Sequence, residues 1–255
     1  MSNLKGKRSF LPLKNFFRRR LYIFFIATGG RFVVQLFQMR NRPLFRAARI
    51  GGPRKGAEGM NICVFGASSS LLAEEYYQAA HAMGAAVAKR GHVLYFGAGD
   101  SGVMGAAARG AHEQGGRVVG VSPAFFHADG MLYDRCDELI LTDSMRERKH
   151  RLEESSDAFI AAPGGVGTYE ELLEVLTLRS LGQLPKPIAL LNTNGCYEPF
   201  LAMLRRGAEE HFLTAAVLDL LFVSTDPEAI LDYVQRFTPE DHAVNYYKAI
   251  EEEPT

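Results

Sequence analysis

The sequence predicts an α/β fold built on a doubly wound parallel sheet. From residue 60 onward, short apolar runs rich in Val, Ile, Leu and Phe alternate with longer segments of helical period. Each run leads into Gly, Ser or Pro, which is typical of parallel βαβ units. The chain has 255 residues, 47% hydrophobic and 23% charged, so one large domain can bury a sizeable core. We therefore expect a single Rossmann-like domain.

Seven apolar runs have the length and composition of buried strands. In chain order they are NICVFGA (61–67), HVLYFG (92–97), RVVGVS (117–122), DELILT (137–142), DAFIAA (157–162), PIALLN (187–192) and LLFVS (220–224). Six segments between and after these runs have helical period. The helices are expected near 72–90, 102–115, 143–155, 168–182, 196–212 and 226–236. In such sheets ligands bind beyond the carboxyl ends of the strands, so a site is expected in the segments that follow them.

Charge is distributed unevenly along a chain whose formal net charge is zero. Residues 1–59 carry 14 Lys and Arg but one acid, which leaves 15 basic and 28 acidic side chains, a charge of −13, in the remainder. We expect a basic, partly apolar arm and linker (1–59), the Rossmann-like domain (60–240) and an acidic tail (241–255). Several interpretations of the arm stay open: weak contact with an anionic membrane surface or with RNA, a role as a transit peptide, and no role at all.

Composition disfavours several other classes of protein. The longest apolar run, Leu21 to Ala27, has seven residues, whereas a spanning helix needs about 20. The chain has three cysteines, Cys63, Cys136 and Cys196. Their odd number and the absence of C-x-x-C spacing disfavour disulfides and a structural zinc site. The seven histidines show no metal-type spacing, so no metal is expected. A reducing cytoplasm is the expected location.

Two segments that follow strands could approach a polar ligand. Gly66 to Ser70, which includes Ser69, offers small residues and hydroxyls. Gly97 to Gly105, which includes Gly99, contains G-x-G-x-x-G and leads into a helix whose amides could hold a phosphate. The next strand ends at Val121-Ser122 without an acid for a ribose diol, so no dinucleotide cofactor is expected.

Two further segments give the strongest signal. The run APGGVGTYEEL, residues 162–172, leads from a strand into a helix, and its glycines let an anion reach backbone amides. The helix that precedes this strand begins DSMRERKH, residues 143–150, and could supply a cation from Arg148 or Lys149. Two other interpretations stay open: Thr168 and Glu171 match a capping box, and residues 146–154 match a solvated face with a Glu147–Arg151 pair.

Four segments together resemble the LOG family of cytokinin riboside 5′-monophosphate phosphoribohydrolases, also described as lysine decarboxylase-like. PGGVGTYEE resembles its PGGxGTxxE motif, MRERK its paired Arg-Lys segment, VFGASS its VFCGSS, and YFGAGDSGVMG its YGGGxxGLMG. The likeness covers about residues 60–215, in the family's order. The chain departs from the family pattern at Ala67, at Ala98 and in the basic arm.

The resemblance implies hydrolysis of the N-glycosidic bond of a nucleoside 5′-monophosphate, such as a cytokinin precursor or AMP, without a cofactor. It implies Arg148 and Glu171 as catalytic residues, and the first helical turn is expected to favour ionisation of Glu171. It also implies a homodimer with composite sites. Met145 would line the base side. Counting back without gaps places Asp134 where the family has an acidic residue that contacts the substrate. The expected substrate-binding residues are Ser69, Gly99, Asp134, Met145, Lys149, Gly164, Gly165, Val166, Gly167 and Thr168.

Other function classes fit the sequence less well. A pyridoxal phosphate decarboxylase would need a Schiff-base lysine, and Lys149 alone is well placed for it. GDSG at 99–102 with His81 is a chance likeness to a serine protease. A noncatalytic nucleotide- or cofactor-binding protein of the same fold is the serious alternative. No specific nucleic-acid partner is expected, although a single-strand binder that uses the arm would show salt-dependent affinity lost without residues 1–59.

Overall fold

The computed structural model describes residues 59–128 and 131–239 together with two strands nearer the N-terminus. The chain divides into two compact units, Met1–Pro53 and Arg54–Thr255. In the first unit, β1 (Ile23–Thr28) pairs antiparallel with β2 (Arg31–Leu36), with Phe25 opposite Val34. This hairpin was not predicted, because the apolar run Leu21 to Ala27 was compared with the length of a spanning helix and not considered for strand pairing. The division at residues 59 and 240 stays a prediction.

The second unit contains a seven-stranded sheet in which every pairing is parallel. Its order is β6-β5-β4-β3-β7-β8-β9. All seven expected strands are present, with ends that differ from the prediction by at most two residues, and the predicted fold class is confirmed. The strands are β3 (Asn61–Phe65), β4 (Val93–Phe96), β5 (Val118–Pro123), β6 (Glu138–Thr142), β7 (Ala158–Ala161), β8 (Ile188–Leu191) and β9 (Leu221–Ser224).

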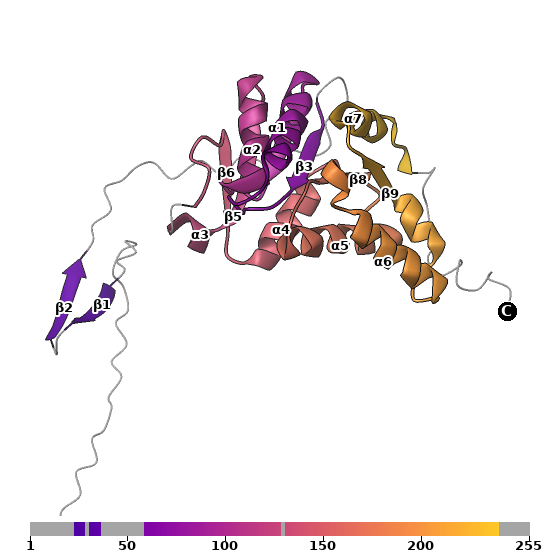
Figure 1. Cartoon of the computed structure of the whole chain (residues 1–255). Helices are drawn as coiled ribbons and strands as arrows, with labels where there is room; N and C mark the ends of the chain where they lie inside the picture. The colour runs from indigo at the N-terminus through magenta and orange to yellow at the C-terminus, as the bar shows by residue number, and fades with distance from the viewer. Residues whose placement is uncertain (1–22, 29–30, 37–58, 129–130, 240–255) are drawn as a thin grey trace, which may run out of the picture. The chain divides into compact units, whose positions relative to one another are not determined.

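Helices cover both faces of this sheet (Figure 1). On one face lie α1 (Glu74–Lys89), α2 (Gly102–Glu113) and α7 (Pro227–Arg236), and on the other lie α4 (Met145–Ser155), α5 (Val166–Ser180) and α6 (Glu198–Glu209). Each face has its own core. The first includes the buried side chains of Val87, Ala107 and Ile230, and the second those of Leu152, Leu172 and Leu201. The fold is therefore doubly wound, as predicted.

Three short elements lie outside the six predicted helices. They are α3 (Ala124–Ala128) and the 3-10 turns η1 (Thr193–Gly195) and η2 (Ala215–Leu220). Segments of three to six residues are too short to show a helical period, so they could not be predicted from periodicity. No helix in the described part of the chain is long and apolar enough to cross a membrane.

The direction of winding reverses between β3 and β7. From β3 the chain winds outward through β4 and β5 to β6, then returns to β7 on the other side of β3. The loops that follow β3 and β7 therefore meet, and the amide of Ala67 donates to the carbonyl of Pro163 over 3.1 Å. Ligands of doubly wound sheets bind at such a reversal point. The two segments with the strongest sequence signal lie near this reversal point. One leads from β7 into α5, and the other begins α4, the helix that precedes β7.

Candidate active site

Two opposite charges are buried against each other near the carboxyl ends of the central strands. Nη1 of Arg148, on α4, donates to Oε1 of Glu171, on α5, over 2.6 Å. Their residues are 7% and 8% exposed. Nε of Arg148 also donates to the carbonyl of Val121 in β5, over 3.1 Å. Two hydrogen bonds in different directions fix the guanidinium in one orientation.

Gly97, which directly follows β4, leaves the space that the guanidinium occupies. A Cβ atom at this position would lie 2.1 Å from Nη2 of Arg148 and 3.3 Å from Sδ of Met104. The absence of a side chain thus lets three segments approach one another: the end of β4, the first turn of α2, and the first turn of α4, which carries Arg148. Met104 was not singled out from the sequence, because a methionine in a helix is usually core.

Glu171 is not in the first turn of its helix, contrary to the sequence-based expectation. The N-cap of α5 is Gly165 and no side-chain hydrogen bond caps it, so Glu171 is the sixth residue of α5. The capping box of Thr168 and Glu171 is therefore wrong, and so is the expected effect of the helix end. Burial raises the pKa of Glu171 above its ordinary value, while the charge of Arg148 opposes this rise.

The glycine loop before α5 presents unpaired amides at the protein surface. Among the described residues, no hydrogen bond uses the amides of Gly165, Val166, Gly167 or Thr168. Gly165 to Gly167 are exposed. Gly164 packs against Thr168, since a Cβ there would lie 2.1 Å from Oγ1 of Thr168. Unpaired amides at the positive end of a 15-residue helix are suited to binding an anion.

The second glycine segment is different, because the amides at the start of α2 are already used. Val103 and Met104 both donate to the carbonyl of Ala67, over 2.9 and 3.3 Å. The hydroxyl of Ser101 donates to the carbonyl of Ser68 over 2.6 Å. A phosphate cradle of free amides at this helix end is therefore wrong. Within the segment, Ala98 has a φ of 63°, which is the left-handed region that glycine adopts more readily.

The start of α4 carries the capping arrangement that the sequence analysis assigned to α5. The N-cap is Ser144, whose Oγ accepts from the amide of Glu147 over 3.2 Å. Oε2 of Glu147 accepts in turn from the amide of Asp143 over 2.9 Å. Glu147 is thus used in the cap, and the expected Glu147–Arg151 pair is not among the contacts of the described residues. Arg148 is buried, so the interpretation of residues 146–154 as only a solvated helix face is also wrong.

The remaining predicted residues lie in four different settings. Met145 begins α4 and is 41% exposed. Lys149 extends toward α5, where it pairs with Glu170 and Glu174. Oγ of Ser69 accepts from the amide of Leu71, and Gly99 forms a β-bridge with Leu132. Asp134 is exposed between α3 and β6, and no hydrogen bond or ion pair of the described residues joins it to Arg148 or Glu171.

One supporting residue had no signal in the sequence. Tyr197, which directly precedes α6, is 1% exposed, and its hydroxyl donates to the carbonyl of Ala162 over 2.7 Å. Ala162 directly follows β7, so this bond anchors the start of the glycine loop. A tyrosine far along the chain cannot be connected to the loop from spacing alone.

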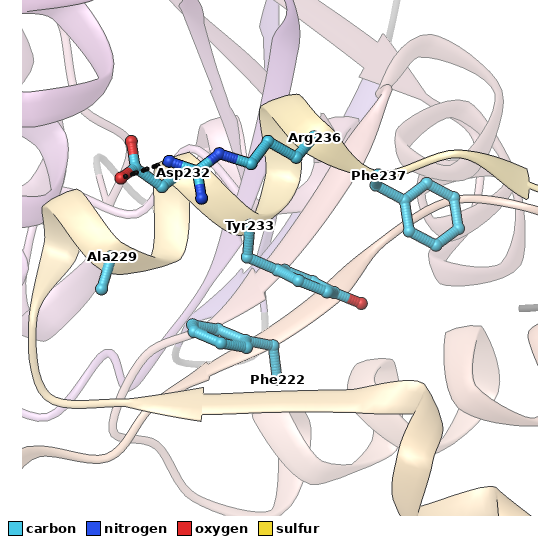
Figure 2. A pocket seen from close by; sticks show the side chains of 6 residues that line it. All are labelled: Phe222, Ala229, Asp232, Tyr233, Arg236 and Phe237. Carbon is cyan, nitrogen blue, oxygen red and sulfur yellow. Dashed lines mark hydrogen bonds and ion pairs between the residues drawn. The ribbon is translucent and has the colours of Figure 1, made fainter. Parts of the chain in front are cut away.

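A hollow of about 440 Å³ lies elsewhere, between β9 and α7 (Figure 2). In it the rings of Phe222 and Tyr233 stack with centroids 4.5 Å apart, and Arg236 pairs with Asp232 over 3.3 Å. None of the predicted site residues lines it. The described residues also contain no group of three His, Cys, Asp or Glu side chains that could hold a metal ion.

The family model and the relatives found by sequence belong to one group of proteins. Residues 104–234 match the family model described as "Possible lysine decarboxylase". The chain is 36% identical to the probable cytokinin riboside 5′-monophosphate phosphoribohydrolase LOGL1 of Oryza sativa subsp. japonica, over 75% of this chain and 85% of the relative. It is 32% identical to the phosphoribohydrolase LOG2 of Arabidopsis thaliana, over 70% of this chain and 84% of the relative.

Solved structures with the same fold include carriers of a cofactor. The Moco carrier protein of Chlamydomonas rheinhardtii is 29% identical with a TM-score of 0.52, over 71% of this chain and 98% of that one. The molybdenum cofactor binding protein of Rippkaea orientalis has a TM-score of 0.55 at 23% identity, over 71% of this chain and 98% of that one, a likeness of fold alone.

Proposed function

Because this chain belongs to the LOG family, we propose that it hydrolyses the N-glycosidic bond of a nucleoside 5′-monophosphate to free base and ribose 5-phosphate. One observation carries the proposal. A buried carboxylate and guanidinium, Glu171 and Arg148, lie 2.6 Å apart on the helices that flank β7, and Glu171 is on the helix whose N-terminal amides are open to an anion. Hydrolysis of the N-glycosidic bond of a nucleoside monophosphate would use these groups.

The phosphate would bind at the N-terminus of α5. The unpaired amides of Gly165 to Thr168 can each donate to a phosphate oxygen, and the helix dipole favours a negative charge there. Such binding fixes the sugar relative to Glu171, six residues into the same helix. Binding energy from the phosphate, which takes no part in the bond cleavage, then serves to orient the anomeric carbon.

Glu171 and Arg148 would perform the chemistry. As the C1′–N bond breaks, positive charge develops on the ribose, and a carboxylate facing C1′ stabilises it. Water adds its oxygen to C1′, one of its protons passes to the carboxylate, and the base leaves with the bonding electron pair and takes up a proton. Arg148 holds the carboxylate in place and can donate to the departing base. A pKa of Glu171 above its ordinary value suits a group that accepts a proton from water.

We also propose a homodimer, and the cytoplasmic location stays a prediction. Three apolar side chains on or just after α5 support the dimer, since Val166, Leu173 and Leu181 are 86%, 39% and 38% exposed. They recur seven and eight residues apart, so they share one side of the helix. A monomer by light scattering would contradict the dimer.

The second candidate is a protein that binds a nucleotide-like cofactor without turnover. It is favoured by the molybdenum cofactor carriers among the structures of the same fold. The same anion site serves both candidates, so release of free base is what separates them.

The proposal is tested by measuring base release from a panel of AMP, N6-isopentenyl-AMP, GMP, IMP, CMP and UMP, with adenosine as the control without phosphate. At least one nucleotide should yield base and ribose 5-phosphate in equal amounts. Since hydrogen bonds to a charged group each contribute about 1.5–3 kcal/mol, adenosine should have a kcat/KM lower by about 100-fold or more than AMP. Nucleotide that binds but is recovered intact across the whole panel would support the second candidate.

Gly97→Ala should lower kcat strongly without unfolding the protein. The new methyl group would displace the guanidinium of Arg148 from Glu171. A misplacement of about 1 Å can cost about 100-fold in kcat, while overpacking typically costs about 1–3 kcal/mol of stability. Steady-state kinetics and thermal melting measure the two effects. In an Arg148→Lys background the same change should cost much less, since the two changes act on one contact; full activity of the single variant contradicts the account.

A further inference from the structure

The hairpin of β1 and β2 has one face that contains no polar residue. Residues of a strand alternate between the two faces of a sheet, and directly paired residues share a face. The pairing of Ile23 with Leu36 and of Phe25 with Val34 therefore defines one face. This apolar face comprises Ile23, Phe25, Ala27, Phe32, Val34 and Leu36. The opposite, mixed face comprises Phe24, Ile26, Thr28, Arg31, Val33 and Gln35.

The first unit contains no other described element that could cover the apolar face. Within Met1–Pro53, β1 and β2 are the described helices and strands, and they form a sheet of their own. A two-stranded hairpin is only marginally stable in water and needs a surface against which its apolar residues pack. An apolar surface bordered by polar residues is typical of an interaction site.

The sequence around the hairpin is strongly basic. Residues 1–59 contain 14 Lys and Arg and one acid. The run Arg18 to Arg20 ends three residues before Ile23, and Arg40 and Arg42 follow Leu36 by four and six residues. Positive charge on both sides of an apolar surface matches an anionic lipid bilayer, whose phosphate groups lie just outside the acyl chains.

Two other occupants fit these observations less well. A second copy of this chain would bring the same positive charge, so the two arms would repel one another. RNA matches the charge, but proteins hold single strands by stacking the bases on aromatic rings. Four of the six residues of the apolar face are aliphatic, which suits acyl chains and offers no ring for stacking.

We propose that residues 1–59 attach the protein to the surface of an anionic lipid bilayer. The apolar face lies at the boundary between headgroups and acyl chains, and the flanking arginines pair with lipid phosphates. Among the interpretations left open for the arm, this one accounts for both its charge and its hairpin. The attachment does not depend on the proposed function of the second unit.

Sedimentation of the full chain with lipid vesicles tests the attachment. Vesicles of phosphatidylcholine with about one third phosphatidylglycerol should bind the protein at least about tenfold more tightly than pure phosphatidylcholine, since each basic residue near an anionic surface contributes about fivefold in affinity. Raising NaCl from about 0.1 M to about 1 M shortens the screening length from about 10 Å to about 3 Å and should weaken binding. Equal binding to both vesicles, or binding to neither, overturns the proposal.

Phe25→Ser and Phe24→Ser test which face meets the lipid. They make the same chemical change at adjacent residues of β1, so any loss of strand propensity is shared. Burial of a large apolar side chain contributes about tenfold or more in affinity, and Phe25→Ser should weaken binding to the anionic vesicles by that factor. Phe24→Ser, on the mixed face, should stay within about threefold of wild type. Equal losses, or a larger loss in Phe24→Ser, contradict the proposal.

The triple variant Arg18→Gln, Arg19→Gln and Arg20→Gln tests the role of charge. Loss of three charges from the arm should weaken binding to the anionic vesicles by about 100-fold. The matched control makes the same substitutions at Arg205, Arg206 and Arg236, which are exposed in the second unit, and removes the same net charge. Its affinity should stay within about threefold of wild type. A control that loses as much affinity as the arm variant would show that the arm is not the attachment site.

Poly(U) in place of vesicles decides between lipid and RNA. Charge alone would hold poly(U) on a basic arm, so we expect Phe25→Ser to bind it as wild type does while binding to anionic vesicles falls. If the full chain binds poly(U) but not the anionic vesicles, or if Phe25→Ser weakens the binding of poly(U) and not of vesicles, the arm is an RNA-binding segment and the proposal is wrong.

Discussion

Glu171→Gln is expected to lower kcat by about 10²- to 10⁴-fold, the usual contribution of a general acid or base. The amide keeps the size of the side chain and its Oε1 can still accept from Arg148, but it can neither take a proton nor balance positive charge on the ribose. In wild type, kcat should fall as the pH drops through the raised pKa of Glu171, because the carboxylate is the active form. That acid limb should be absent in the variant.

The same variant should lose some stability, and this has to be measured beside activity. Arg148 would remain charged and buried with a weaker partner, at a cost of about 1–3 kcal/mol. The control is Glu209→Gln on the exposed side of α6, which makes the same chemical change far from the buried pair. Unchanged base release by folded Glu171→Gln would remove the carboxylate from the mechanism.

Arg148→Lys is expected to lower kcat by about 10²-fold although it keeps the charge, comparable to the loss of one donor from a preorganised site. The guanidinium donates from Nε to Val121 and from Nη1 to Glu171 in different directions. A single ammonium on a flexible chain cannot reproduce this fork. The carbonyl of Val121 or the carboxylate of Glu171 would lose its donor.

Arg206→Lys supplies the matched control, since Arg206 is a surface residue of α6 that pairs with Glu209 over 3.5 Å. Its kcat should stay within about twofold of wild type, as surface changes seldom exceed about 0.5 kcal/mol. Equal rates for Arg148→Lys and this control would show that charge alone is needed at residue 148, and the fork would have no role.

The fold was predictable because its inner strands β3, β5, β7 and β8 are almost entirely buried. Runs such as ICVF in β3 and IALL in β8 are continuously apolar, and their residues are almost all buried. Parallel strands joined by helices admit few arrangements, so the order along the chain led to the doubly wound sheet. Helix starts were less certain, because Gly165 gives no side-chain signal for the N-cap of α5.

Within the site, the sequence predicted which segments meet but not how their groups are used. Glycines around residue 97 suggested a phosphate site, whereas the carbonyl of Ala67 occupies the amides there and Gly97 makes room for Arg148. Lys149 was read as a free cation because its partners Glu170 and Glu174 lie on another helix. Contacts between residues distant in the chain depend on how helices are rotated, and spacing along one helix does not determine that.

A crystal structure of Glu171→Gln with a nucleoside 5′-monophosphate would measure the central arrangement directly. We predict the phosphate on the amides of Gly165 to Thr168, with C1′ in contact with the substituted side chain and Arg148 beside the base. A phosphate bound away from these amides, or a nucleotide bound in the hollow between β9 and α7, would contradict it.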